Sequence, residues 1–412
     1  MIEVSEKPEI AIVGAGPAGA FAALNLAKLG LARRTAVFEE HDEIGKPSHC
    51  AGHLNIETIK MLGMKLPAKI IENEIKGAVF YSPSGLSFAV KREEPVTVVV
   101  NRELFDRAIA EEAEKLGVKF HLGCRVERLL IKKGKVAGIV VRNLREKTRE
   151  DVYLKLVIDA EGVSAALLKK ANFPYPSSEN LVYGCQAIVD DVETVNQDFV
   201  EVYLSRKFAH GLFAWIIPRR DGTAKVGLAV KHGNPRRALF DFIYKHPIAS
   251  EKLRKSRILR LSFHPIPLGG PIKKTYAHGL LVIGDAASQV KPTTGGGVLT
   301  GMICAKIAAK TAFKALNLNN FSEEFLAEYQ REWKSKLGFE FKSMLRLRRI
   351  LDRLSDRQID KLFQLCIKTD LNEILTKVGD VDFQGRTLLK AALHPKSLIP
   401  LLHLIWLAIT GR

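Results

Sequence analysis

Apolar and polar positions near the start of the chain follow the order of a strand, a turn and a helix. The apolar run Ile10–Val13 is followed by Gly14-Ala15-Gly16-Pro17-Ala18-Gly19 and then by an Ala/Leu-rich stretch that ends at Gly30. This order predicts a short buried parallel strand, a glycine turn and a helix over 20–29. A second buried strand is predicted over 35–38, and it ends in Glu39.

The rest of the chain divides into three kinds of pattern. Asn101 predicts an N-cap for a helix that continues to Gly117. Residues 54–72 and 235–255 are predicted to be helical, a long helix is predicted from 295 to about 316, and 322–412 are predicted to be almost wholly helical. β-Branched and alternating stretches predict strands over 75–100, 119–122, 125–132, 136–142, 154–158, 280–283 and most of 179–232.

These elements predict an α/β protein with a discontinuous Rossmann-type domain, a β-rich substrate domain and a helical C-terminal region. The expected bounds are 1–72, 97–178 and 258–318 for the first domain, 73–96 and 179–257 for the second, and 319–412 for the third. A chain of 412 residues is long enough for two or three such domains.

Composition narrows the classes of function. The net charge of +18 is explained either by solubility and thermophile-type use of Lys, Arg and Glu or by a partner that is negatively charged. Among such partners an anionic substrate or a membrane surface is favoured over nucleic acid, because no nucleic-acid-binding motif is found. The five cysteines lack CxxC spacing, so no metal site and no disulfide framework is expected. The first apolar run belongs to the predicted strand and no signal peptide is recognised, which predicts a cytoplasmic protein.

The glycine motif predicts a dinucleotide site. Gly14 permits the tight turn, Gly16 lets the backbone approach a pyrophosphate, and Gly19 lets the helix pack on the strand. The helix N-terminus offers unpaired N–H groups to phosphates. Glu39 stands where an acidic residue would bind the ribose hydroxyls.

Two later segments extend this motif. Residues 157–164 read VIDAEGVS and residues 279–287 read GLLVIGDAA. With the first motif, in this order, they resemble the fingerprints of flavoproteins of the p-hydroxybenzoate hydroxylase type, which implies FAD as cofactor. The FAD contacts that this resemblance implies are Gly14, Ala15, Gly16, Pro17, Ala18, Gly19, Glu39, Glu40, Cys50, Ala51, Gly52, Arg102, Val126, Asp159, Gly162, Gly284, Asp285, Gly295, Gly296, Gly297 and Val298.

A narrower resemblance lies in residues 45–52, GKPSHCAG, and residues 213–218, FAWIIP. These resemble the cysteine loop and the aromatic-x-Trp-x-x-Pro segment of geranylgeranyl reductases, with Phe213 where tyrosine is usual. The resemblance implies that Cys50 lies over the flavin and that Phe213 and Trp215 line a prenyl pocket. Substrate contacts are also expected at His49 and Pro218.

The expected reaction is saturation of isoprenoid C=C bonds, on a geranylgeranyl lipid or on geranylgeranyl diphosphate. Cys50 is the candidate proton donor, and it could instead position the alkene or tune the flavin. Because no second GxGxxG is found, NAD(P)H or ferredoxin is expected as an external electron donor. The alternative is an FAD-dependent monooxygenase or halogenase, since halogenases carry a similar Trp-x-Trp-x-Ile-Pro motif; the lysine that they need is not matched by Lys76.

The C-terminal stretch 397–410 is apolar, and 383–412 contain no acidic residue. About 14 residues are too few to span a bilayer. Two interpretations remain open: a terminal helix packed on the body, or an interfacial helix that contacts a membrane peripherally, with Trp406 at the depth of the headgroups.

Overall fold

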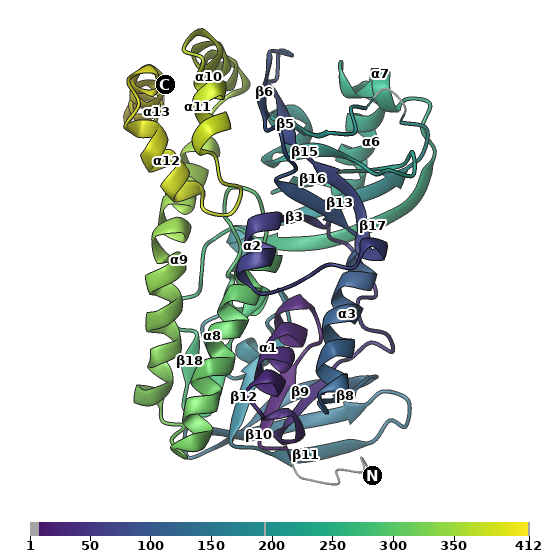
Figure 1. Ribbon diagram of the computed structural model, residues 1–412, viewed down its shortest axis with the longest axis vertical. Coiled ribbons are helices and arrows are strands. Elements are labelled where there is room, and N and C mark those ends of the chain that lie inside the picture. Colours follow the sequence, from purple (N-terminus) through teal and green to yellow (C-terminus); the bar gives the residue numbers. More distant parts are fainter. Residues whose placement is uncertain (1–7, 193–194, 411–412) are drawn as a thin grey trace.

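A parallel sheet of six strands forms one half of the molecule. The computed structural model describes residues 8–192 and 195–410 (Figure 1). The strand order is β18-β19-β12-β1-β2-β8, and only the β18–β19 pair is antiparallel. The strands are β1 (Ile10–Val13), β2 (Thr35–Phe38), β8 (Lys119–His121), β12 (Leu156–Asp159), β18 (Tyr276–Ala277) and β19 (Leu280–Val282). Segments far apart in sequence therefore meet in one sheet.

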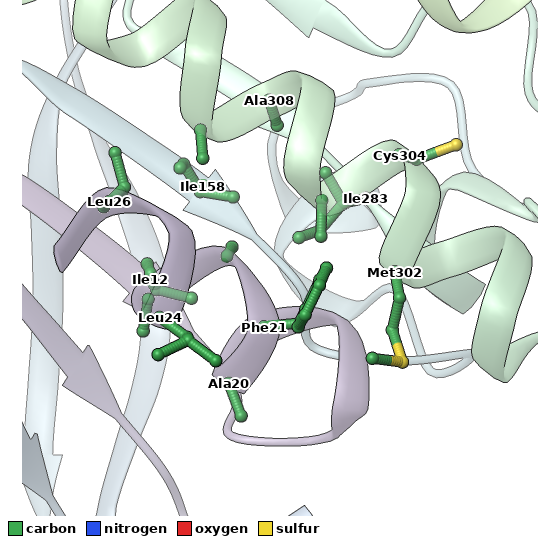
Figure 2. Packing of buried hydrophobic residues seen from close by; sticks show 14 of the residues in the cluster. Ile12, Ala20, Phe21, Leu24, Leu26, Ile158, Ile283, Met302, Cys304 and Ala308 are labelled. Carbon is green, nitrogen blue, oxygen red and sulfur yellow. The ribbon is translucent and has the colours of Figure 1, made fainter. Parts of the chain in front are cut away.

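Helices cover one face of this sheet and a smaller sheet covers the other. On the first face lie α1 (Pro17–Lys28), α3 (Arg102–Lys115) and α8 (Val298–Asn317), and their apolar side chains share one core with Ile12 and Ile158. Figure 2 shows side chains that α1 and α8 contribute to this core. On the second face lie α4 (Ala166–Lys170) and the antiparallel strands β9 (Cys124–Lys132), β10 (Lys135–Asn143) and β11 (Arg149–Tyr153). This is the three-layered arrangement of a Rossmann-type domain.

A seven-stranded sheet forms the other half of the molecule (Figure 1). Its order is β17-β13-β16-β15-β14-β5-β6. The strands are β5 (Gly77–Tyr81), β6 (Ser87–Lys91), β13 (Leu181–Val189), β14 (Phe199–Tyr203), β15 (Gly211–Pro218), β16 (Ala224–Val230) and β17 (Ile258–Pro267). Its core also contains side chains of α5 (Arg206–Ala209), α6 (Pro235–Lys245) and α7 (Ala249–Leu253).

A small sheet and the C-terminal helices complete the fold. The order β3-β7-β4 joins β3 (His53–Asn55), β7 (Thr97–Val100) and β4 (Ile71–Ile75), with α2 (Ile56–Met61) after β3. The long helix α9 (Glu323–Leu351) packs along α8. It is followed by α10 (Asp356–Lys368), α11 (Leu371–Val378), α12 (Gln384–Ala392) and α13 (Leu398–Thr410).

The structure differs from the sequence predictions in several places: for example, the predicted helix 235–255 is divided into α6 and α7. Residues 54–72 contain the short helix α2 and one 3-10 turn at 68–70 in place of a continuous helix, because 53–55 and 71–75 pair with β7. Residues 258–267, grouped by sequence with the Rossmann-type domain, form β17 and pair with β13 in the seven-stranded sheet. Strand β11 was not predicted; its side chains are mostly exposed, so its sequence lacks the apolar alternation of a half-buried strand.

Candidate functional site

The glycines of the first motif divide into two that the fold requires and one that it leaves open. A Cβ at Gly14 would lie 2.6 Å from the Ala160 carbonyl oxygen, and φ there is +91°. A Cβ at Gly19 would lie 2.0 Å from the Gly14 oxygen. A Cβ at Gly16 would meet no described atom within 4 Å. Gly16 therefore borders free space at the start of α1, as close backbone approach to a pyrophosphate requires.

Glu39 points back to this turn. One carboxylate oxygen accepts a hydrogen bond from the Ala15 N–H at 2.7 Å, and the other accepts one from the His41 N–H at 2.9 Å. Glu39 is 8% exposed at the end of β2. The neighbouring Glu40 instead forms a surface ion pair with Arg125 at 2.6 Å, so Glu39 is the better placed acidic group for a ribose.

Asp159 ends β12, the strand that pairs with β1, and is fully buried. Its Oδ1 accepts the Glu161 N–H at 3.0 Å, whereas Oδ2 has no hydrogen-bond partner within the described residues. Burial and the nearby Glu161 carboxylate raise the pKa of Asp159. An orphaned buried oxygen beside the motif is available to a polar ligand. Gly162 follows at φ +82° with open space around its Cα.

The second glycine-rich loop, residues 284–297, leads into α8. Neither α1 nor α8 has a side chain that caps its N-terminus, and their starts lie close together, since a Cβ on Gly301 of α8 would be 3.6 Å from the Ala18 Cβ. A Cβ at Gly297 would lie 2.8 Å from Oδ1 of Asp285. Two uncapped N-termini near the motif strands provide several free N–H groups for phosphates. These residues fit a bound dinucleotide.

The cysteine loop lies beside α3. Cys50 accepts a weak hydrogen bond from the Gly52 N–H, with 3.4 Å between nitrogen and sulfur. Arg102 is buried and forms a bidentate ion pair with Asp106: its Nε donates to Oδ1 at 3.2 Å and a terminal nitrogen donates to Oδ2 at 2.8 Å. Burial acts to lower the pKa of Arg102, but Asp106 and the adjacent Cys50 outweigh it and the pKa is raised. Arg102 therefore stays charged next to the Cys50 sulfur.

His49 connects the cysteine loop to the second glycine-rich loop. Its ring stacks on His264 of β17, with centroids 4.5 Å apart and planes 10° apart. The His264 Nε2 lies 3.9 Å from Oδ2 of Asp285. The pKa of His49 is lowered to about 4, mainly by burial and secondly by the nearby His264. His49 is therefore neutral near pH 7 and cannot supply a proton as an imidazolium.

Strand β15 of the seven-stranded sheet, which carries Phe213 and Trp215, reaches the same region. Phe213 and Trp215 pack edge to face, with ring centroids 6.0 Å apart. Trp215 lies over Gly227, donates a hydrogen bond to Gln186 Oε1 at 3.2 Å, and shares an apolar cluster with Ala51 of the cysteine loop. A Cβ at Gly295 would contact Ile266 of β17 at 3.2 Å, and Ile266 packs with Phe213 and Trp215. The two loops and the aromatic strand therefore converge.

Two of the predicted site residues make contacts that belong to the packing of the fold. Pro218 is buried at the end of β15, and its carbonyl accepts a hydrogen bond from Asn73 at 3.1 Å. Val126, on β9, packs against the apolar cluster behind the six-stranded sheet. The roles of both residues remain predictions. A cavity of about 50 Å³ between β15 and the C-terminal helices, lined in part by Leu212 and Phe363, is too small for a prenyl chain.

Sequence reasoning missed two buried ion pairs at the site. Lys225 of β16 and Glu72 of β4 pair at 2.6 Å beneath the cysteine loop. Lys291, in the second glycine-rich loop, pairs at 2.5 Å with Asp382 from the turn before α12. A lysine inside the apolar strand 224–230 was the signal available for the first pair. The second pair joins distant segments, and no local pattern announces it.

Comparisons with known proteins identify the family to which the chain belongs. The chain matches the family model described as an FAD binding domain over residues 7–334. The digeranylgeranylglycerophospholipid reductase of Methanocaldococcus jannaschii is 34% identical over 88% of this chain and 91% of its own. That of Methanococcus vannielii is 32% identical over the same shares of the two chains.

Solved structures show the same fold. A geranylgeranyl bacteriochlorophyll reductase-like protein of Thermoplasma acidophilum is 26% identical, with a TM-score of 0.84 over 97% of this chain and 99% of its own. A variant of a flavin-dependent brominase, Bmp2, is 18% identical, with a TM-score of 0.73 over 97% and 98%, which shows the fold alone. The resemblance found in the sequence is thus confirmed, and FAD is the cofactor. The chain belongs to the family of FAD-dependent oxidoreductases that includes the digeranylgeranylglycerophospholipid reductases.

Proposed function

We propose that this protein saturates C=C bonds in the geranylgeranyl chains of a digeranylgeranylglycerophospholipid. The proposal rests mainly on one observation. Cys50 lies beside Arg102, and the next residue, Ala51, belongs to an apolar cluster with Trp215. It brings a thiol and an aromatic surface together next to the second glycine-rich loop. The relatives named for this reaction, at 34% and 32% identity, support it.

Each residue has a distinct role in this proposal. FAD, when bound and reduced, supplies hydride. Cys50 delivers the proton to the alkene, directly or through a water, and the buried Arg102 cation lies beside its sulfur. Trp215 and Phe213 exclude water, and their ring faces favour positive charge that develops on the alkene carbon. NAD(P)H or ferredoxin re-reduces the flavin.

The test is product mass. The FAD-loaded protein, reduced chemically under argon, is incubated with a digeranylgeranylglycerophospholipid, and each saturated bond adds the mass of two hydrogen atoms. Cys50→Ser should keep FAD and lose most of the turnover, whereas Ser84→Ala, on the exposed β5–β6 turn, is a control. Unchanged turnover in the Cys50 variant would refute the catalytic role of the thiol. A halide-dependent product that needs oxygen would support the halogenase alternative.

We also propose that α12 and α13 contact the membrane that holds the lipid. Leu393 is 81% exposed and Leu402 61% exposed, and further exposed apolar side chains on these helices are Leu389, Ile399 and Trp406. Arg386, Lys390 and Lys396 lie on or between the same helices, and 383–412 contain no acidic residue. Within the described residues no helix is long and apolar enough to cross a membrane. An apolar surface with basic flanks suits an interface rich in anionic lipid.

Sedimentation with anionic vesicles tests this contact. The change Leu402→Glu should move the protein from the pellet to the supernatant, because it places a carboxylate at the proposed interface. Leu318→Glu, at a residue 68% exposed just after α8, is the matched control and should still sediment. Equal sedimentation of the Leu402 variant and the wild type would contradict the proposal.

A further inference from the structure

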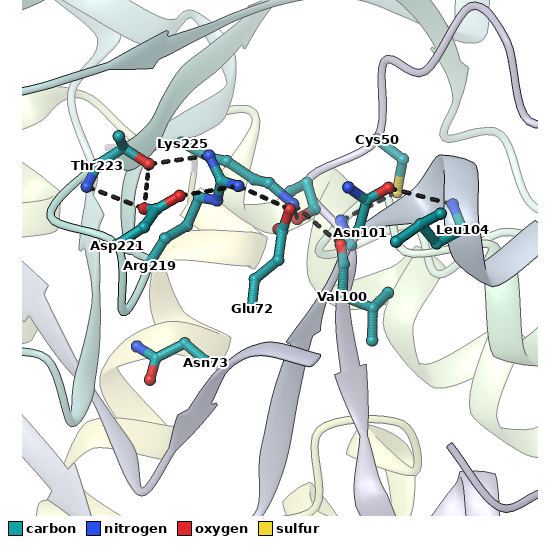
Figure 3. Close-up of polar contacts among 12 residues, drawn as sticks. Cys50, Glu72, Asn73, Val100, Asn101, Leu104, Arg219, Asp221, Thr223 and Lys225 are labelled. Carbon is teal, nitrogen blue, oxygen red and sulfur yellow. Dashed lines mark hydrogen bonds and ion pairs between the residues drawn. The ribbon is translucent and has the colours of Figure 1, made fainter. Parts of the chain in front are cut away.

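A buried lysine lies directly beneath the cysteine loop. Lys225 is on β16, an interior strand of the seven-stranded sheet, and is 5% exposed. Its ammonium group donates to the Ala51 carbonyl at 2.9 Å and to the Val100 carbonyl at 3.0 Å, and it pairs with Oε2 of Glu72 at 2.6 Å (Figure 3). The two carbonyl oxygens accept hydrogen bonds from the ammonium group, and the Glu72 carboxylate balances its charge. One side chain thus joins the cysteine loop, the end of β7 and β4.

Glu72 fixes the lysine from the other side. Its Oε1 pairs with Arg219 at 3.0 Å, and Arg219 also pairs with Asp221 at 3.1 Å and donates to Thr223 Oγ1 at 2.9 Å (Figure 3). The network therefore extends from the cysteine loop to the turn between β15 and β16. Burial lowers the pKa of Lys225, against the opposing effects of Glu72 and Cys50. A charge is kept in such a place only when its partners are well arranged.

Lys225 holds the part of the cysteine loop that directly follows the Cys50 thiol. Val100 accepts from Lys225 and donates its own N–H to the Gly52 oxygen at 2.8 Å. Gly52 in turn donates its N–H to the Cys50 sulfur. A Cβ at Gly52 would lie 2.4 Å from the Val100 oxygen and 3.3 Å from the Lys225 nitrogen. The loop is thus packed onto the lysine, which leaves no room for a side chain between them.

We propose that Lys225, held by Glu72, is a positioning residue that fixes the Cys50 thiol for proton delivery. It makes no contact with the reacting atoms in this assignment, and acts by binding the carbonyl of the residue that follows Cys50. The catalytic part of this assignment rests on the proposed reductase function. The positioning part does not, because it concerns where the loop lies.

Thiol labelling measures that position without relying on activity. Cys50 is the half-buried cysteine, and Cys124, Cys185, Cys304 and Cys366 are buried. A maleimide added to the FAD-loaded protein should therefore label Cys50 first, and the four buried thiols report whether the fold stays intact. Mass spectrometry of the tryptic peptides separates the sites.

The variants are Lys225→Met, Lys225→Arg and the double variant Lys225→Met with Glu72→Gln. Loss of the charged hydrogen bonds should speed Cys50 labelling by about tenfold or more, with the four buried thiols unchanged. The rate constant kcat should fall by about tenfold or more while KM changes little, and arginine should restore part of both. If Lys225→Met alone fails to fold because it leaves Glu72 short of a partner, the double variant removes that charge. Lys91→Met, on the exposed edge strand β6, is the control.

Two outcomes separate the inference from the function it rests on. Labelling of Cys50 at the wild-type rate in the FAD-loaded double variant would overturn the positioning role. Faster labelling of Cys50, in a protein whose wild type reduces no geranylgeranyl lipid, would support the positioning role and refute the proposed function.

Discussion

The open space at Gly16 gives a sharp test of where FAD lies. Gly16 has φ −63° and ψ 178°, an extended conformation that alanine adopts without strain. Because a Cβ there meets no described atom within 4 Å, Gly16→Ala should leave the apoprotein as stable as before, or more stable by about 0.4–1 kcal/mol through the unfolded chain. The added methyl group would instead occupy the approach of the pyrophosphate.

We therefore expect Gly16→Ala to weaken FAD binding without destabilising the apoprotein. We expect FAD affinity to fall by about 100-fold, which is about 2.8 kcal/mol at 1.4 kcal/mol per tenfold. Gly14→Ala is the contrast, because φ +91° there costs alanine about 1–2 kcal/mol before the 2.6 Å approach to Ala160 is counted. Apoprotein is prepared by removal of the flavin. Its melting temperature is measured on one sample, and a second, folded sample is titrated with FAD. Wild-type FAD affinity in Gly16→Ala would refute the placement of the pyrophosphate.

Two further predictions concern stability. Asp382→Asn should destabilise the fold by about 3 kcal/mol or more, because it leaves the buried Lys291 without its charge partner; Asp370→Asn, which breaks the exposed pair with Lys396, should cost no more than about 1 kcal/mol in the same urea titration. Burial lowers the pKa of His246 from 6.5 to about 4, and its Nδ1 accepts the Ile248 and Ala249 N–H groups. Since the unfolded chain then binds the proton more tightly, this contribution is present above pH 6.5 and is lost as pH falls toward 4. His246→Asn should flatten the fall in unfolding free energy between pH 7 and about 4.5, and an unchanged slope would contradict the assignment.

The sequence was most informative where the pattern is local. The motif 14–19 needs its glycines for contacts within the motif and with the neighbouring strand, and Asn101 caps α3 through the Leu104 N–H, as predicted. The strands around residues 54–72 were mistaken for helix because their pairing with β7 is not visible in a short apolar stretch.

The parts of the site that could not be predicted are made by long-range contacts. Lys225 meets Ala51 across 174 positions of sequence, and Lys291 meets Asp382 across 91. His49 stacks on His264, which sequence had grouped with a different sheet. Buried charges of this kind depend on which segments the fold brings together.

In the proposed reaction, the reduced flavin of this protein passes its electrons to an isoprenoid alkene. The most direct measurement mixes the reduced, FAD-loaded protein with excess digeranylgeranylglycerophospholipid in the strict absence of oxygen and follows the flavin absorbance. The proposed reaction predicts that the oxidised flavin spectrum returns without oxygen, with one C=C bond saturated for each flavin reoxidised. A flavin that stays reduced in the presence of the lipid, and is reoxidised only when oxygen is admitted, would contradict it.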